Sequence, residues 1–477
     1  MVVPRRGAVA RESAAAREQY RRGRCGATAC LRACVRRHEI RNSAAPMRKA
    51  SAGCRRFPPL FARCGRTVRR SGRSSVKTFP IHRGCNQCGM PLHYDALMNG
   101  TDADEAVASG LCAHCSSMQS VRRTEYEPDA DHEWLLDAII SAADGERTWR
   151  HKALSVAKRV PIVGDGSLGA AAAMLDSIPT REPRSTYAAM VLYSGGKDST
   201  YMLVQLAEKG LNVCAWMLDP GYQSPQTLES ARRVTEKLGI PLVIERPDKA
   251  LTDALFRSGF SIDENSDVDL QKGAMTYGSA CWPCFSLIAV SASAFANRHR
   301  IPLCFIGTQK GQNRLNLEGT GVLSARALPK VNDLVAKFVQ PFRKVIPDHS
   351  GSLDADPDDI RFPTVLVPYY ELIRKPAREI QIAHIERYDW ILPKNTGACS
   401  SNCMINELGR AVMRSRFGFD LYQVIDANER RLGHAPDRAA SSSPDPAIVR
   451  LGATMLGLSE QEAAEFGVTI RKGNHDA

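Results

Sequence analysis

The chain of 477 residues is 43% hydrophobic, which is enough for two to four domains and at least one sizeable buried core. Its formal net charge of +13 is typical of a nucleic-acid-binding protein, but residues 1–80 carry a net +18, which leaves about −5 for the remaining 397. The charge of these 397 residues therefore gives no argument that they bind a polyanion such as nucleic acid. Because no run of about 18 apolar residues occurs, the sequence also excludes a membrane-spanning protein.

The basic excess lies in residues 1–78, an Arg-, Ala- and Gly-rich segment without aliphatic periodicity. Three interpretations stay open: a basic arm for nucleic acid, an organellar transit segment, and a mis-assigned start with translated leader sequence, which we favour. No signal peptide is recognisable, so we expect a reducing, cytoplasmic compartment. Cysteines beyond this segment are then expected to be metal ligands or reactive thiols rather than disulfides.

Residues 79–120 contain two CxxC pairs, "CNQC" and "CAHC", separated by 23 residues. Their cysteines are Cys85, Cys88, Cys112 and Cys115. Two such pairs supply the four thiolates of a tetrahedral zinc site. The sequence therefore predicts an N-terminal zinc ribbon that serves as a scaffold or docks a substrate; an iron–sulfur or redox role is the alternative.

Residues 121–186 are expected to form a helical linker region, and from residue 187 strands and helices alternate. Apolar runs at 188–194, 212–218, 241–247 and 301–308 predict buried strands, and helical spacing is found at 199–210, 224–239 and 283–300. This alternation predicts an α/β domain over 187–345, with a parallel sheet and helices on both faces. A mostly helical C-terminal extension is expected over 346–432, and a partly disordered tail over 433–477.

The motif "SGGKDS" lies where the first predicted strand ends and the first predicted helix begins. At such a junction the helix amides are unpaired and carry a partial positive charge. Two glycines let the backbone approach an oxyanion, and the lysine adds a cation. The motif therefore predicts a phosphate-binding loop; a glycine turn capped by serine is the alternative.

This motif resembles the PP-loop of the ATP pyrophosphatase superfamily (adenine nucleotide alpha-hydrolase-like), over about 187–345. The resemblance implies a Rossmann-like (HUP) sheet that binds ATP and Mg²⁺ and cleaves ATP between the α and β phosphates. AMP then activates a carbonyl oxygen, which nitrogen or sulfur displaces. The residues implied for the pyrophosphate are Ser194, Gly195, Gly196, Lys197, Asp198 and Ser199, with Lys197 and Asp198 catalytic. Adenine is expected near Leu218, Asp219 and Gly307.

A second group of cysteines consists of Cys281, Cys284, Cys399 and Cys403. Together with the loop, this group resembles the tRNA 2-thiolation branch of the superfamily. The resemblance implies a [4Fe–4S] cluster on Cys281, Cys284 and either Cys399 or Cys403, with one iron free to carry sulfide. Alternatives are a second zinc site made by all four cysteines and a persulfide carrier, which needs a thiolate of lowered pKa. Among the four, Cys399 is the predicted catalytic residue.

The function predicted first is ATP-dependent activation of a carbonyl oxygen followed by sulfur insertion. The alternative is an amidotransferase, because the two-knuckle module followed by "SGGKDSTY" also resembles N-acetyl sugar amidotransferases over 85–205. Expected partners are a small-molecule or RNA acceptor, and a sulfur donor protein or a separate glutaminase; a homodimer is left open. A third interpretation is a binding module with a degenerate nucleotide fold.

Overall fold

The computed structural model describes residues 83–120, 132–146, 149–157, 167–312, 327–346, 353, 362–431 and 442–470. Chain contacts separate residues 1–75 from residues 76–477, and every described residue belongs to the second unit. The basic segment predicted over 1–78 lies outside the described residues, as do residues 433–441 and 471–477 of the predicted tail.

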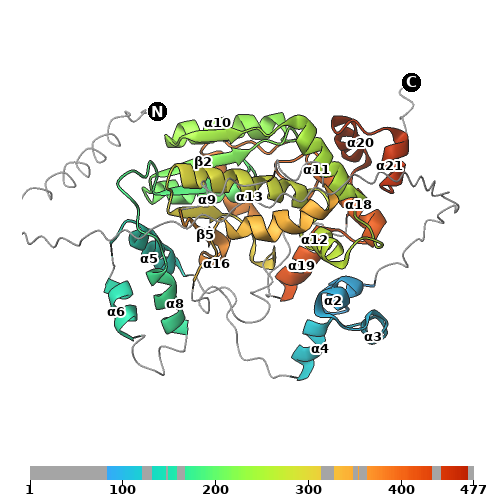
Figure 1. Ribbon diagram of the computed structural model, residues 1–477, viewed down its shortest axis with the longest axis horizontal. Helices are drawn as coiled ribbons and strands as arrows, with labels where there is room; N and C mark the ends of the chain where they lie inside the picture. The colour runs from blue at the N-terminus through green and yellow to red at the C-terminus, as the bar shows by residue number, and fades with distance from the viewer. Residues whose placement is uncertain are drawn as a thin grey trace, which may run out of the picture. The chain divides into compact units, whose positions relative to one another are not determined.

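The centre of this unit is a parallel sheet of five strands (Figure 1). Its strands are β1 (Ala189–Leu192), β2 (Val213–Leu218), β3 (Leu242–Glu245), β4 (Leu303–Ile306) and β5 (Val365–Pro368). They lie in the order β3-β2-β1-β4-β5, and every neighbouring pair is parallel. The predicted α/β class with a Rossmann-like parallel sheet is confirmed.

Alternate residues of the strands enter two different hydrophobic cores, because successive side chains of a strand point to opposite faces. Met190 and Cys304 join the core that contains Trp282, whereas Val191 and Phe305 join the core that contains Leu203. Both faces of the sheet are therefore buried, as the near-continuous apolar runs predict.

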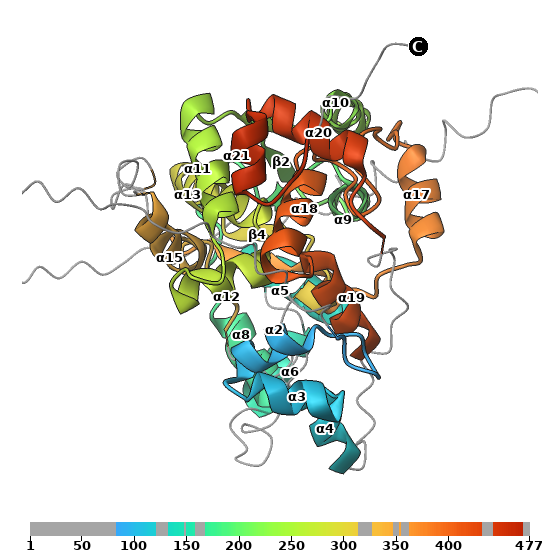
Figure 2. The same cartoon turned by 90° about the vertical axis from the view of Figure 1, so that its right-hand side faces the viewer.

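Helices cover both faces, as predicted (Figures 1 and 2). One core takes side chains from α11 (Lys249–Ser261), α12 (Val268–Tyr277) and α13 (Cys281–Arg298), followed by η3 (Val335–Val339), α15 (Gln340–Phe342) and η4 (Arg343–Val345). The other core takes side chains from α5 (Glu133–Ala143), α6 (Trp149–Ala157), α8 (Ser167–Asp176), α9 (Lys197–Glu208), α10 (Pro225–Leu238) and α16 (Tyr369–Leu372).

The strand order reverses between β1 and β4, since the chain runs outward from β1 to β3 and then returns to form β4 on the other side. In open parallel sheets a ligand crevice lies at the carboxyl ends of the two strands that flank such a reversal. The loops that start at Tyr193 and Gly307 therefore meet at this crevice.

The fifth strand, β5, comes from residues beyond 345, where the sequence analysis ended the ATP-binding domain. The run "TVLVP" is short and ends in proline, and a polar acidic segment separates it from β4. Because this segment breaks the alternation of strands and helices, the sequence analysis did not predict β5 as part of the sheet.

The N-terminal module consists of α2 (Leu92–Asn99), α3 (Ala103–Ser109), α4 (Ala113–Ser120) and one antiparallel bridge between Gly84 and Pro91. The expected ribbon is thus a mostly helical knuckle in this chain. The C-terminal region is mostly helical, as predicted. It contains α17 (Arg378–Glu386), α18 (Asn406–Phe417), α19 (Leu421–Arg431), α20 (Pro446–Met455) and α21 (Glu460–Glu465).

Within the described ranges, no helix on its own has both the length and the apolar composition needed to cross a membrane. Helices α12 and α13 meet that criterion only together, as a pair bent by 90°.

Candidate functional site

A pocket of about 280 Å³ opens at the crevice between β1 and β4. Its lining includes four segments far apart in sequence: the loop after β1, the loop after β4, the first turns of α13, and residues 399–406. The end of β2 with the loop that follows it, Phe256 and Tyr422 complete the lining. The topology of the sheet brings the first two together, and packing on the β2 side brings the others. The pocket therefore joins the predicted phosphate loop to the second group of cysteines.

The loop "SGGKDS" has the strand-to-helix geometry that its sequence predicts. Gly195 has φ +72°, and a Cβ there would lie 2.6 Å from Thr227 Cγ2, so glycine is required. Helix α9 begins at Lys197, and its N-cap is Gly196, which supplies no side-chain cap. The Ser194 amide donates to Ser199 Oγ at 3.2 Å, which closes the turn. Of the predicted pyrophosphate residues, those that line the pocket are Ser194, Gly196, Asp198 and Ser199.

The Lys197 side chain is 5% exposed, and Lys197 is not among the residues that line the pocket. Its ammonium donates to Asp198 Oδ1 at 2.6 Å and to Gln381 Oε1 on α17 at 2.6 Å. Asp198 also accepts from Gln309 Nε2 at 3.3 Å and lies 3.5 Å from the ammonium of Lys375. The predicted catalytic lysine is thus held beside the pocket by Asp198 and Gln381.

Residues 399–403 lie directly against the phosphate loop. The Lys197 amide donates to Ser401 Oγ at 3.0 Å, and a Cβ at Gly196 would lie 2.9 Å from the same oxygen. Asn402 O accepts from the Ser224 amide at 2.9 Å, which anchors the segment to the start of α10. Sequence reasoning missed Ser401 and Asn402; their place between two cysteines of the predicted site was the one available signal.

Of the three positions expected near adenine, Leu218 and Gly307 line the pocket and Asp219 does not. Gly307 lines the pocket, and a Cβ there would lie 3.6 Å from the Ser199 Cα, so the chain passes close over the first turn of α9. Asp219 is buried outside the pocket lining, where it pairs with Arg246 at 3.0 Å and accepts from the Gly221 amide at 3.0 Å. Its position fits a structural role in the turn after β2.

All four cysteines of the second group line the pocket. Burial raises the pKa of Cys281 to about 12 and that of Cys403 to about 11, and it raises the pKa of Cys284 well above its ordinary value. These three thiols are near enough to influence one another electrostatically. Without a metal they are protonated near neutral pH, which disfavours the persulfide carrier.

These four sulfurs are not gathered around one point. Among the described residues, the N-terminal cysteines are the only group of three or more potential ligands whose atoms lie within 4.8 Å of one another. The arrangement therefore does not fit a second zinc site made by all four cysteines. A cluster of several irons spreads its thiolates over a wider shell, so the pocket cysteines remain compatible with that alternative.

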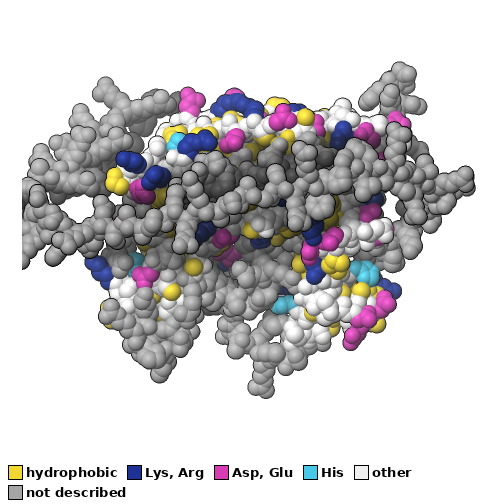
Figure 3. Space-filling model, viewed as in Figure 1, with side chains coloured by type: hydrophobic (Ala, Val, Ile, Leu, Met, Phe, Trp, Pro, Cys, Tyr) yellow, Lys and Arg dark blue, Asp and Glu magenta, His cyan; other side chains and the backbone are white. Residues whose placement is uncertain are grey.

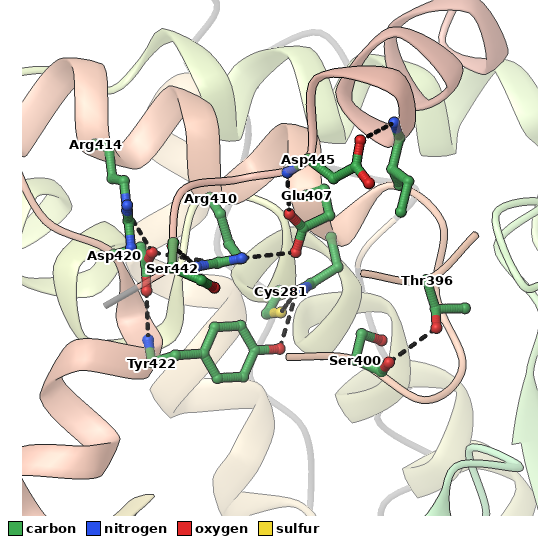
Figure 4. Close-up of polar contacts among 12 residues, drawn as sticks. Cys281, Thr396, Ser400, Glu407, Arg410, Arg414, Asp420, Tyr422, Ser442 and Asp445 are labelled. Carbon is green, nitrogen blue, oxygen red and sulfur yellow. Dashed lines mark hydrogen bonds and ion pairs between the residues drawn. The ribbon is translucent and has the colours of Figure 1, made fainter. Parts of the chain in front are cut away.

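A buried polar network supports the pocket beside Cys281 (Figure 4). The Cys281 sulfur lies 4.0 Å from Asn406 Oδ1, which also accepts from Tyr422 OH at 3.0 Å. One turn along α18, Arg410 pairs with Glu407 at 2.8 Å and with Asp420 at 3.2 Å. Because these charges are almost fully buried, they fix the start of α18, and with it the wall next to the cysteines.

The N-terminal cysteines are fully gathered. The sulfurs of Cys85, Cys88, Cys112 and Cys115 all lie within 4.8 Å of one another, and all four residues are buried. The Cys88–Cys112 sulfur distance of 3.7 Å matches the edge of about 3.8 Å that follows from tetrahedral zinc with bonds of about 2.3 Å. The donor set fits a single metal ion, and zinc remains the predicted identity.

Arg431, at the end of α19, contacts this cluster and was missed by sequence reasoning, which found no role for "RLGH". Its Nη2 donates to Cys112 Sγ at 2.9 Å and to Asp95 Oδ1 at 3.2 Å, and its Nε donates to Cys88 Sγ at 3.4 Å. Figure 2 shows the end of α19 next to α2. No sequence spacing links residue 431 to the cysteines, because the contact is made by tertiary packing alone.

Comparisons with known proteins gave a family match, two curated relatives and a solved structure. Residues 188–269 match the family described as the phosphoadenosine phosphosulfate reductase domain. Two curated relatives, both 7-cyano-7-deazaguanine synthase from strains of Leptospira interrogans, are 38% identical over 80 residues, or 16% of this chain. This match spans about a third of the length of those relatives, 33%.

Among solved structures, the chain is similar to a glutamine-dependent NAD⁺ synthetase from Acinetobacter baumannii in complex with ADP. The identity is 17%, the coverage is 59% of this chain and 49% of that one, and the TM-score is 0.21.

Proposed function

We propose, from the premise that the chain belongs to the PP-loop ATP pyrophosphatase superfamily of enzymes, that it cleaves ATP to AMP and pyrophosphate in order to activate a carbonyl oxygen. The superfamily predicted from "SGGKDS" is confirmed by the family match over 188–269 and by the synthase relatives. These matches support ATP-dependent chemistry. The group that replaces the activated oxygen is a proposal.

The observation that carries the proposal is the shared pocket. Its lining includes the phosphate loop at one side and the cysteines of α13 and of residues 399–403 at the other. The amides at the start of α9 would hold the departing pyrophosphate, which would replace the Ser401 hydroxyl on the Lys197 amide, and Mg²⁺ would offset the charge that develops there. An acceptor bound in the same pocket then lies between the α-phosphate and the thiols, which supplies proximity.

Sulfur is the nucleophile we propose first. Cys281, Cys284 and either Cys403 or Cys399 would hold an iron–sulfur cluster, which would supply sulfide when bound. The chain itself contributes the apolar side chains of Trp216, Phe285 and Ile288. They line the same pocket and would exclude water from the activated acceptor.

Ammonia is the second candidate, and one observation favours it. Buried thiols with raised pKa values are poor nucleophiles, so without a cluster the pocket has no activated sulfur. The acceptor would then become an amide or amidine, as in N-acetyl sugar amidotransferases.

A small uncharged acceptor fits the pocket better than RNA. Among the described lining residues, Asp198 is the only one that carries a formal charge. On the face drawn in Figure 3, the coloured Lys and Arg side chains are interspersed with Asp and Glu rather than gathered as RNA phosphates require.

The test uses anaerobically purified protein with Mg²⁺-ATP and either total RNA or a protein-free small-molecule extract. We expect AMP and pyrophosphate to form with the small-molecule extract, when sulfide or ammonium is added. Sulfide dependence with protein-bound iron supports the first candidate, and ammonium dependence without iron supports the second. Formation of ADP and phosphate would contradict both. Lys197→Met should abolish AMP formation, because the variant removes the cation next to the phosphate loop.

A further inference from the structure

Helix α19 contacts the cysteine cluster at its last residue and, one turn earlier, Gly311, which lies between two residues that line the pocket. At Arg431 the guanidinium donates to the Cys88 and Cys112 sulfurs. At Asn428 the Nδ2 atom donates to Gly311 O at 2.8 Å, and the Gly311 amide donates to Glu429 Oε1 at 2.7 Å. One helix thus joins two sites that are more than 190 residues apart in sequence.

The contact with the pocket wall is tight. A Cβ at Gly311 would lie 2.8 Å from Ile425 O, so α19 cannot shift toward this segment. Residues on either side of Gly311, Gln309 and Gln312, line the pocket. Gln309 Nε2 also donates to Asp198 Oδ2 at 3.3 Å, which carries the contact to the phosphate loop.

The contact with the cluster depends on charge. The Arg431 side chain is 5% exposed, and the anionic groups around it are the cluster sulfurs and Asp95. Four thiolates around a divalent ion carry net negative charge, which a guanidinium in hydrogen-bond contact offsets. A buried guanidinium that loses such partners is strongly destabilised. Metal binding at the cysteine cluster therefore stabilises Arg431 and the position of α19, and Arg431 in turn stabilises the metal-bound cluster.

We propose that Arg431 is a positioning residue that couples metal occupancy of the cysteine cluster to the shape of the nucleotide pocket. In this proposal the metal acts on the nucleotide pocket through α19, which holds residues 309–312. The proposal does not depend on which nucleophile or acceptor the enzyme uses.

The test compares Arg431→Gln with the matched variant Arg430→Gln in the full-length, zinc-loaded protein. Two quantities are measured: the rate of zinc transfer to a chromogenic chelator, and the affinity for Mg²⁺ with α,β-methylene-ATP, which cannot be cleaved between those phosphates. For Arg431→Gln we expect zinc release about 10–100-fold faster and nucleotide affinity at least about fivefold weaker. Arg430 donates to the Cys88 carbonyl rather than to a sulfur, so its variant should stay near wild type in both.

A second variant separates the two ends of the helix. Asn428→Asp keeps an acceptor for Arg431 but loses the donor to Gly311 O. It should weaken nucleotide binding and leave zinc release unchanged.

The wild-type protein supplies the measurement that does not depend on a variant folding. Removing zinc with a chelator should weaken nucleotide binding about as much as Arg431→Gln does, and adding zinc back should restore it. Unchanged nucleotide affinity in the zinc-free protein, or in an Arg431→Gln protein that releases zinc faster, would overturn the proposal. Because binding is measured without turnover, failure of the proposed reaction cannot produce this result.

Discussion

The chain carries two groups of four cysteines that begin with the same CxxC spacing and end in different geometry. In the N-terminal group the two pairs belong to one short module, and all four sulfurs lie within 4.8 Å. In the pocket group the pairs are more than a hundred residues apart, on α13 and on the segment before α18, and no three sulfurs are gathered that closely among the described residues. Each group has a buried arginine nearby, but Arg431 donates to sulfur directly, whereas Arg410 pairs with Glu407 and Asp420.

This difference shows what a spacing motif can predict. A CxxC pair fixes two sulfurs at one turn; a second pair completes a tetrahedral site only if the fold brings it within a few ångströms. In the N-terminal module the local chain does so by itself. In the pocket, the sheet topology places the pairs on walls of a 280 Å³ space, which suits a ligand or a larger cluster.

The largest effect is expected from Cys112→Ser. Removing one of four ligands should abolish metal binding in the module, and metal binding provides much of the folding free energy of such small sites. We expect bound metal to fall from one ion to none per chain in the N-terminal module, with a drop in melting temperature. Elemental analysis and calorimetry measure both. Cys281→Ser is the control: it should keep that metal, and equal losses in the two variants would show that the groups are not independent.

The next largest effect, a loss of folding stability, is expected from Arg410→Leu. Glu407 and Asp420 are 1% and 0% exposed, so the variant leaves two buried carboxylates without their shared partner. The free energy of unfolding is expected to fall by about 3–5 kcal/mol. Urea unfolding measures it, with Arg414→Leu as the control. Arg414 is 22% exposed and pairs only with Asp420 among the residues of this network, so its loss should cost clearly less.

Much of the fold was predictable from sequence, because its signals are local. The apolar runs of β1 to β4, the helix between each pair, and the glycines of "SGGKDS" each specify a conformation within a few residues. The strand β5 was missed, since a polar segment breaks the alternation before it.

The site was predictable only in part. The phosphate loop and the N-terminal cysteines are sequence motifs, and both lie where expected. Ser401, Asn406 and Arg431 are not parts of motifs; they reach the site by packing of α18 and α19, which no spacing encodes. Lys197 was expected to face phosphate, and its actual partners, Asp198 and Gln381, include one on a helix 184 residues away.

A smaller effect is expected from Ser401→Ala. The Ser401 hydroxyl accepts from the Lys197 amide, a donor that a phosphate oxygen could use. If the hydroxyl competes with phosphate, its removal should strengthen binding of α,β-methylene-ATP by about two- to tenfold, the net worth of one neutral hydrogen bond. Calorimetry measures the affinity. Ser400→Ala is the control, because the Ser400 hydroxyl contacts the Asn402 and Cys403 amides instead; weaker binding by Ser401→Ala would show that Ser401 supports the nucleotide.

The last prediction concerns the protonation of the pocket thiols in metal-free protein. Burial raises the pKa of Cys281 to about 12 and that of Cys403 to about 11, from an ordinary value of 9.0. The thiolate fraction at pH 8 to 10 is therefore smaller in the folded than in the unfolded chain, and it grows about tenfold per pH unit. Alkylation by iodoacetamide, followed peptide by peptide with mass spectrometry, should rise over this range without a plateau, whereas in urea it should reach half of its maximum near pH 9 and level off near pH 10.

A plateau below pH 9 in the folded protein would contradict this prediction. It would mean that a cation stabilises the thiolates, and a persulfide carrier would then become the better explanation of the pocket cysteines. Among the N-terminal cysteines Cys88 should differ, because the hydrogen bond from Cys112 lowers the pKa of Cys88, whereas the same hydrogen bond raises the pKa of Cys112 to about 12. Cys88 should thus be alkylated at lower pH than Cys281, and equal profiles for these two thiols would contradict the hydrogen bond from Cys112 to the Cys88 sulfur.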